Sequence, residues 1–258
     1  MKVVLSIAGS DSSGGAGIQA DLKTFEAFGV FGTSVITVLT AQNTTGVSDI
    51  NKIDSKFIKS QLKAVFDDFD ISAIKIGMLF SNEIIDMIRE FIKDLNIPIV
   101  FDPVFISKAG SKLLNDDAIE NLKTLFPYST IITPNLYEAK MLFDYDINNN
   151  KSINEIMQLP CATVVKNHKH NIDKSLDILY IKNSKKTFES EYLDNDNYHG
   201  TGCSYSSAIA SNLALGKSLE QSVEIAKKFI YEAIKNAPNL GNGSGPIAHK
   251  IGGENVKG

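Results

Sequence analysis

The sequence is poor in cysteine, tryptophan and long hydrophobic runs. Its 258 residues include two cysteines and no tryptophan. Two cysteines cannot build a disulfide framework, and the spacing of Cys161 and Cys203 matches no zinc or redox motif. The apolar run nearest the start, residues 3–8, is too short for a signal-peptide core or a membrane span. We therefore expect a cytoplasmic protein with no membrane segment.

Positive charge is also scarce. The chain has 26 Lys and Arg against 30 Asp and Glu, a formal net charge of −4, and Arg89 is its only arginine. Nucleic-acid binders need a clustered excess of positive charge, so that class is excluded. Because bidentate guanidinium recognition is confined to one position, a bound anion must be held by lysines or backbone N–H groups.

Short apolar runs alternate with amphipathic stretches along the chain. The runs are nearly continuous, which is typical of parallel strands covered on both faces. They lie at residues 3–8, 34–40, 73–76, 97–101, 130–133 and 162–166. Residues 54–69 and 82–95 have apolar side chains at helical spacing. The length and this alternation predict one α/β domain over residues 1–258, with helices on both faces of a mainly parallel sheet.

The last third of the chain shows a different pattern. Residues 177–181 and 187–192 flank a polar turn and predict an antiparallel hairpin. Residues 204–215 and 218–236 predict two helices, separated by a C-cap glycine and an N-cap serine. From residue 241 onward the glycine-rich tail is predicted to be a loop.

A glycine-rich loop, residues 9–17, follows the first predicted strand and leads into a helix. The Walker pattern needs a lysine after its last glycine and is absent. The dinucleotide fingerprint fits loosely as Gly15-x-Gly17-x-x-Ala20, but the acid expected after the second strand is missing. A tight turn without a ligand is the alternative.

A second glycine loop, His199-Gly200-Thr201-Gly202-Cys203, opens the helix at residue 204. Converging N–H groups and the helix dipole favour an anion there, and the same field should favour the thiolate of Cys203. A cysteine phosphatase would need an arginine where Ile209 stands. A Cys-His hydrolase using His199, or a capping loop with an inert cysteine, remain alternatives.

Further polar residues end the later strands. Asn135 and Glu138, three apart, can direct oxygen atoms to one point and suit Mg²⁺, although a helix-capping arrangement is the favoured interpretation of this pair taken alone. Lys75, Asp102 and Lys166 lie at or near strand ends, where they could meet a ligand. We expect His168 and His170 at the surface rather than on a metal, and Cys161 in the core.

Together these segments resemble the hydroxymethylpyrimidine and phosphomethylpyrimidine kinases of thiamine biosynthesis, members of the ribokinase-like superfamily. The matching blocks span nearly the whole chain, at residues 7–25, 40–44, 75–79, 102–104, 133–138, 199–203 and 245–249. The resemblance implies a three-layer ribokinase-like fold, ATP and Mg²⁺ as cofactors, and a homodimer. It implies phosphorylation of 4-amino-5-hydroxymethyl-2-methylpyrimidine, and often of its monophosphate.

The resemblance also implies a role for individual residues. Gln42 would hydrogen-bond the aminopyrimidine ring, with Gly9, Asp21 and Met78 near the same pocket. The anion hole around the transferring phosphoryl group would be formed by Gly200, Thr201 and Gly202. Cys203 would be the base that accepts the hydroxyl proton. Asn135 and Glu138 would position Mg²⁺, and Lys166 and Thr201 would contact the nucleotide.

Two departures from the family pattern leave the nucleotide contact open. Asn167 follows Lys166 where the family usually has glycine, and residues 141–163 form a short stretch for the family. The nearest alternative is a pyridoxal kinase, whose members often carry an apolar residue in place of Gln42. A non-catalytic pyrimidine-binding regulator and an NAD-dependent oxidoreductase are further alternatives, the last disfavoured by the missing acid.

Overall fold

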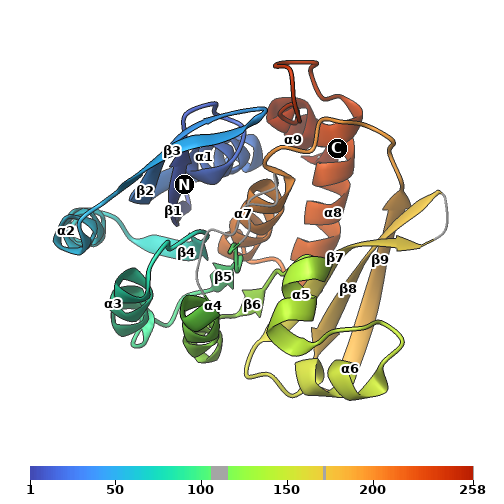
Figure 1. Ribbon diagram of the computed structural model, residues 1–258, viewed down its shortest axis with the longest axis horizontal. Helices are drawn as coiled ribbons and strands as arrows, with labels where there is room; N and C mark the ends of the chain where they lie inside the picture. The colour runs from blue at the N-terminus through green and yellow to red at the C-terminus, as the bar shows by residue number, and fades with distance from the viewer. Residues whose placement is uncertain (106–115, 171–172, 258) are drawn as a thin grey trace.

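The protein was analysed as a computed structural model that describes residues 1–105, 116–170 and 173–257. In these residues nine strands form one sheet in the order β3-β2-β1-β4-β5-β6-β7-β8-β9 (Figure 1). The strands are β1 (Val3–Asp11), β2 (Phe31–Asn43), β3 (Gly46–Lys52), β4 (Ile71–Ile76), β5 (Ile99–Phe101), β6 (Ile131–Ile132), β7 (Ala162–His170), β8 (Lys174–Ile181) and β9 (Ser184–Glu191). Strands β2, β1, β4, β5, β6 and β7 are parallel, and β3, β8 and β9 pair antiparallel.

Helices cover both faces of this sheet, which gives three layers (Figure 1). The helices are α1 (Gly17–Phe28), α2 (Ser55–Phe66), α3 (Asn82–Ile92), α4 (Asp116–Leu122), the 3₁₀ helix η1 (Lys123–Tyr128), α5 (Leu136–Phe143), α6 (Asn150–Met157), α7 (Thr201–Ala214), α8 (Leu219–Lys235) and α9 (His249–Lys257). Alternate side chains of a strand enter opposite cores. Val4 of β1 packs with α1, α7 and α8, whereas Leu5 packs with α2 and α3.

The expected fold class is confirmed, including all six parallel strands and the late hairpin. Helix α7 begins three residues earlier than expected, and α8 begins after its Ser218 cap as expected. The prediction of a loop from residue 241 onward is wrong beyond Ala248, because α9 follows. Two glycines let α9 approach its neighbours: a Cβ on Gly252 would lie 3.0 Å from the Phe229 oxygen, and one on Gly253 2.8 Å from the Ala27 oxygen.

Strand β3 was not expected from the sequence. It pairs antiparallel with β2 and forms a hairpin at the edge of the sheet. Its side chains are mostly exposed, so the apolar run that identifies a buried strand is missing. This hairpin rises beside the carboxyl end of β1, where it forms one wall of the site described next.

The order of the strands places that site. The chain passes from β1 to β2 on one side and later returns to β4 on the other side of β1. Neighbouring parallel strands whose connections leave in opposite directions create a crevice at their carboxyl ends. The loops after β1, β4, β5 and β6 therefore converge on one place.

Candidate active site

A cleft of about 1040 Å³ opens at the carboxyl ends of the parallel strands. It is lined by segments far apart in the sequence, among them the loop after β1, the β2–β3 hairpin and the first turn of α7. Of the site residues expected from the sequence, ten line it: Gly9, Gln42, Met78, Asn135, Glu138, Lys166, Gly200, Thr201, Gly202 and Cys203. Asp21 is the exception.

Asp21 lies beneath the cleft and is fully buried. Its Oδ2 accepts hydrogen bonds from Ser6 at 2.6 Å and from Lys75 at 2.8 Å, and its Oδ1 accepts one from Ser207 at 2.8 Å. With these bonds made and no exposed surface, Asp21 lies behind the residues that line the cleft. It holds Lys75 instead. Burial disfavours the charge on Lys75, but the nearby acidic groups, Asp21 first among them, together outweigh burial and raise the pKa of the lysine.

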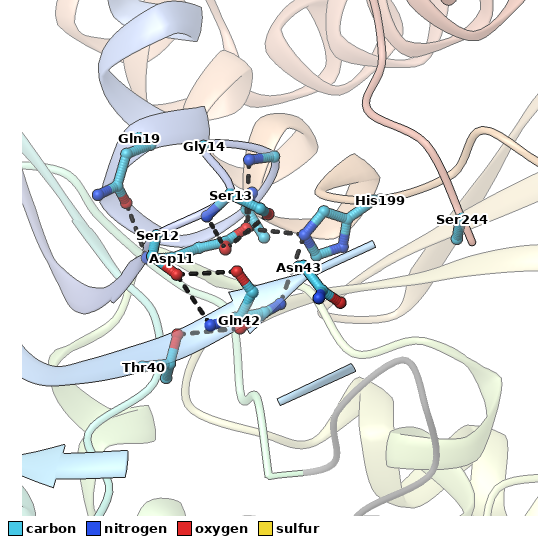
Figure 2. Close-up of polar contacts among 12 residues, drawn as sticks. Asp11, Ser12, Ser13, Gly14, Gln19, Thr40, Gln42, Asn43, His199 and Ser244 are labelled. Atoms are coloured by element: carbon cyan, nitrogen blue, oxygen red, sulfur yellow. Dashed lines mark hydrogen bonds and ion pairs between the residues drawn. The ribbon is translucent and has the colours of Figure 1, made fainter. Parts of the chain in front are cut away.

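Three side chains form a hydrogen-bonded cluster at the hairpin end of the cleft (Figure 2). Nε2 of His199 lies 2.7 Å from Oδ2 of Asp11 and 3.4 Å from Nε2 of Gln42. The hydroxyl of Ser12 bonds both the backbone N–H and the backbone oxygen of Gln42, each at 2.8 Å, which fixes the hairpin to the loop. We call Asp11, Gln42 and His199 the ring end of the cleft. These residues come from three segments that lie far apart in the sequence.

The two glycine loops interlock behind this cluster. Gly200 has φ +82°, and a Cβ there would lie 1.8 Å from the backbone oxygen of Gly15. A Cβ on Gly15 would in turn lie 2.2 Å from Cδ2 of His199. Close approach therefore requires glycine at both positions, and at Gly200 the left-handed backbone conformation requires it as well.

The first turn of α7 forms the opposite end of the cleft. Gly200 caps this helix, and no side chain caps its N–H groups. A helix N-terminus with uncapped N–H groups is suited to an anion. The expectation that this field favours the Cys203 thiolate is not supported, because burial raises the pKa of Cys203 to about 11 against the opposing effect of Lys75. His199 bonds to Asp11, so a Cys-His pair is not formed in this structure.

Two charged side chains and one hydroxyl, from three neighbouring strands or the residues after them, meet beside this turn. Lys166 donates to Oδ1 of Asp102 at 2.7 Å, and Thr133 donates to the same oxygen at 2.7 Å. Burial opposes ionisation of Asp102, but Lys166 and Lys75 outweigh it and lower its pKa. The buried Oδ2 of Asp102 has no hydrogen-bond partner among the described residues. A Cβ on Gly202 would lie 3.7 Å from that oxygen.

Asn135 and Glu138 form a capping box at the start of α5. The Asn135 side chain accepts the Glu138 N–H at 2.9 Å, and the Glu138 carboxylate accepts the Asn135 N–H at 2.8 Å. The capping interpretation of this pair is thus confirmed. Burial raises the pKa of Glu138 to about 7, with Lys166 opposing the shift. We call Asp102, Lys166, Glu138 and the first turn of α7 the phosphate end of the cleft.

A buried histidine supports the phosphate end from behind. Nε2 of His249, at the start of α9, lies 2.8 Å from the hydroxyl of Ser204, the residue after Cys203. Burial lowers the pKa of His249 to about 4. The neutral ring can accept a hydrogen bond from the Ser204 hydroxyl, and this bond ties α9 to the first turn of α7.

Asp11 is the site residue that sequence reasoning missed. The only signal was its position at the end of β1, within the glycine-rich segment 9–17, since its partner His199 lies 188 residues away. Cys161 packs against the core, where burial raises its pKa to about 12, as expected of a core residue. The side chains of His168 and His170 lie outside the described residues. No described helix combines the length and apolarity needed to span a bilayer.

Comparisons with known proteins agree on one group of relatives. Residues 11–248 match the family described as phosphomethylpyrimidine kinase. A hydroxymethylpyrimidine/phosphomethylpyrimidine kinase of Haemophilus influenzae is 42% identical, with 96% of this chain and 97% of the relative covered. The solved phosphomethylpyrimidine kinase of Clostridium difficile 630 has 46% identity and a TM-score of 0.78, covering 91% of this chain and 100% of that one. The ADP complex of Bacillus subtilis pyridoxal kinase has 35% identity and a TM-score of 0.88, covering 97% and 98%.

Proposed function

We propose that this chain, which belongs to the phosphomethylpyrimidine kinase family, transfers the γ-phosphoryl group of ATP to the hydroxymethyl group of 4-amino-5-hydroxymethyl-2-methylpyrimidine. A second transfer to the resulting monophosphate completes the proposed role in thiamine biosynthesis. The observation that carries the proposal is the single cleft that holds the Gln42 amide at one end and the uncapped start of α7 at the other. The first suits a ring edge with polar atoms, and the second suits a phosphoryl group.

The phosphate end supplies what phosphoryl transfer needs most, which is positioning and stabilisation of negative charge. Gly200 and Gly202 contribute N–H groups at the start of α7, whereas the Thr201 N–H already donates to the Tyr198 oxygen at 3.2 Å. Lys166 contributes a buried cation beside them, since Gly202 lies next to its ammonium group. These groups take the place of arginines, of which the sequence has one, Arg89.

Cys203 is the proposed base for the hydroxymethyl proton. It lines the cleft in the first turn of α7, where the attacked phosphoryl group would sit. With a pKa of about 11 it is a thiol at neutral pH in the free protein. The base role therefore requires that the rate rise with pH, as the thiolate fraction grows. Without a base, the anion hole and substrate positioning would still accelerate transfer.

Mg²⁺ fits the oxygen atoms at this end of the cleft. Oδ2 of Asp102 is buried without a described partner, and Glu138 lies beside the same lysine. Carboxylate oxygens are the ligands that Mg²⁺ prefers, completed by water and nucleotide phosphates. In the described chain no three His, Cys, Asp or Glu side chains gather as a complete metal site. When bound, the ion would neutralise charge on the phosphates. Asp102 is the best placed of these residues; in the capping box the Asn135 oxygen accepts the Glu138 N–H, and one of the two Glu138 carboxylate oxygens accepts the Asn135 N–H.

A homodimer is proposed on a separate observation. In the described residues β3 is an edge strand, and Leu39 of β2 and Ile50 of β3 expose 39% and 36% of their surface. Unpaired edges with apolar side chains are common places of association. Light scattering of the full chain tests this, and a monomer mass at micromolar concentration would contradict it. The two free cysteines fit the proposed cytoplasmic location.

Pyridoxal phosphorylation is the second candidate, favoured by the close fold of the Bacillus subtilis enzyme. Gln42 argues for the pyrimidine, because an amide can donate and accept at an aminopyrimidine edge. The test is ADP release with the pyrimidine, its monophosphate, pyridoxal and pyridoxine. We expect the two pyrimidines to give the fastest release. Fastest release with pyridoxal would overturn the assignment, and pyrimidine binding without MgATP binding in calorimetry would indicate a regulator.

A further inference from the structure

The direction of each hydrogen bond at the ring end can be worked out from its neighbours. Asp11 is 3% exposed and His199 is 8% exposed, so neither depends on bulk water for its partners. Oδ2 of Asp11 accepts the N–H groups of Gly15 at 3.2 Å and Ala16 at 2.8 Å, and faces His199 at 2.7 Å. Oδ1 accepts two bonds from Ser13. Every partner of this carboxyl group is a donor or can be one.

Asp11 is therefore an ionised acceptor. Burial opposes its ionisation, but the bonds from His199 and Ser13 outweigh burial and hold its pKa well below the ordinary value. A carboxylate has no proton to give, so Nε2 of His199 carries the hydrogen and donates it. An N–H group on the histidine cannot accept a hydrogen bond from the amide nitrogen of Gln42, which is placed 3.4 Å away. Since Asp11 receives the one hydrogen of Nε2 at 2.7 Å, the Gln42 amide makes only a secondary contact with this N–H group at 3.4 Å, and the amide oxygen is the compatible atom for it.

The contact between the Gln42 amide and Thr40 indicates the same orientation of the amide. The hydroxyl of Thr40 lies 3.0 Å from the backbone oxygen of Ser10 and 3.1 Å from the atom placed as Oε1 of Gln42. One hydroxyl has one hydrogen, and the Ser10 oxygen can only accept. Thr40 therefore donates to Ser10 and accepts from Gln42. The oxygen and nitrogen of an amide are assigned from such networks rather than from shape. Both neighbours require the amide nitrogen toward Thr40 and the oxygen toward His199.

We propose that Asp11 and His199 are positioning residues that fix the orientation of the Gln42 amide and thereby select the ring edge that the enzyme accepts. This proposal rests on the proposed pyrimidine substrate. A fixed amide offers an acceptor beside a donor, because its oxygen keeps a second lone pair and its nitrogen a second hydrogen. An aminopyrimidine edge has the complementary order, an amino donor beside a ring-nitrogen acceptor. A ring whose polar atoms come in another order leaves a group unpaired, which is a strong basis for rejection.

The arrangement separates selection from chemistry. His199 lies between the Gln42 amide and the loop that leads into α7, and its backbone N–H bonds the Gly245 oxygen at 3.0 Å. Its side chain serves the ring end, whereas the next residues, from Gly200 onward, serve the phosphate end. A change in the His199 ring should thus alter which substrate binds more than it alters phosphoryl transfer itself.

A double-mutant cycle between His199 and Gln42 tests the proposal. The variants are His199→Leu, Gln42→Met and the pair, assayed with the pyrimidine and with pyridoxal, together with KM for MgATP. We expect His199→Leu to lower kcat/KM for the pyrimidine by about ten- to hundredfold and for pyridoxal by less than about threefold. In the Gln42→Met background, His199→Leu should cost nothing further for the pyrimidine. His199→Gln, which can still donate to Asp11, should recover part of the loss.

The control is Ser13→Ala, which removes a hydroxyl from Oδ1 of Asp11 and leaves the Oδ2 contact with His199. It should change the substrate ratio by less than about threefold. Equal losses on both substrates, or additive losses in the cycle, overturn the proposal and indicate a merely structural role for His199. Calorimetric binding of the pyrimidine completes the same cycle without turnover. Failure of the wild-type protein to phosphorylate the pyrimidine would instead reject the proposed function.

Discussion

The two ends of the cleft differ in the kind of interaction that builds them. The phosphate end relies on buried charges, with Lys166 paired to Asp102 in the cleft and Lys75 paired to Asp21 beneath it. The ring end has one carboxylate, one imidazole and one amide, joined by directional hydrogen bonds. Charge stabilises any transferring phosphoryl group, whereas bond direction distinguishes one ring from another. Damage to the first should affect all substrates alike, and damage to the second should change their ratio.

The largest expected effect comes from removing the cation beneath the phosphate end. Lys75→Met leaves Asp21 buried without its charged partner, since both side chains are fully buried. Breaking a buried ion pair costs about 3–5 kcal/mol, to be measured as the free energy of unfolding in urea. The control is Lys63→Met, whose pair with Asp67 is largely exposed and contributes about 0.5 kcal/mol or less. The double variant Lys75→Met with Asp21→Asn should recover part of the loss. Equal losses in Lys75→Met and in the control Lys63→Met would contradict a buried pair.

The next effect is a pH dependence of stability from His249. Its pKa is about 4 in the folded protein and 6.5 as the ordinary value, so the unfolded chain binds more protons between these pH values. Stability is complete above pH 6.5 and is lost as the pH falls toward 4. At 1.36 kcal/mol per unit the contribution reaches about 3 kcal/mol.

His249→Gln should remove this dependence, because glutamine does not titrate. Urea unfolding of both proteins at several pH values between 4 and 8 gives the difference directly. Ser204→Ala serves as the matched variant, since it removes the hydrogen bond but keeps the buried histidine. A wild-type minus variant difference that stays flat across this range would show that His249 is not buried as a neutral ring.

The third effect is on turnover. Cys203→Ala should lower kcat by about two orders of magnitude for the pyrimidine and for pyridoxal alike, as expected for a general base. Below pH 11 the rate of the wild-type enzyme should rise with pH, because the thiolate fraction of Cys203 rises. Cys161→Ala, which removes the other thiol from the edge of the core, is the control for both measurements. Normal turnover in Cys203→Ala would show that Cys203 is not the base and that the anion hole alone accelerates transfer at this end.

The smallest effect is the most selective. Gln42→Met should lower kcat/KM for the pyrimidine by about tenfold, the value of one or two hydrogen bonds. Turnover of pyridoxal should change by less than about threefold, because the phosphate end is intact. The measurement is the ratio of the two kcat/KM values. An unchanged ratio would remove Gln42 from ring recognition.

The phosphate end could be largely predicted from the sequence, and the ring end only in part. Lys166, Asp102 and Glu138 follow or end parallel strands, so the sheet brings them together without any knowledge of loop structure. The glycine loop at residue 199 likewise precedes a helix that is evident from its pattern. These signals are local, and the fold makes them coincide.

Other features depend on contacts that no local pattern encodes. The pairing of Asp11 with His199 joins residues 188 positions apart. The sequence indicates a helix dipole that should lower the pKa of Cys203. Burial raises that pKa instead, and burial depends on the packing of distant segments. Asp21 was placed near the pocket by resemblance alone, and only packing shows that it lies beneath the lining, bonded to Ser6, Ser207 and Lys75. Strand β3 lacks a buried face, so its sequence carries no apolar pattern.

One competition assay tests the central assignment most directly. The intact protein is given MgATP with equal concentrations of 4-amino-5-hydroxymethyl-2-methylpyrimidine and pyridoxal, and both phosphorylated products are measured in the same tube. Their ratio equals the ratio of kcat/KM values, whatever the fraction of active protein. The ring end predicts at least about tenfold more phosphorylated pyrimidine. An excess of pyridoxal phosphate, or no phosphorylated product of either kind, would contradict the assignment.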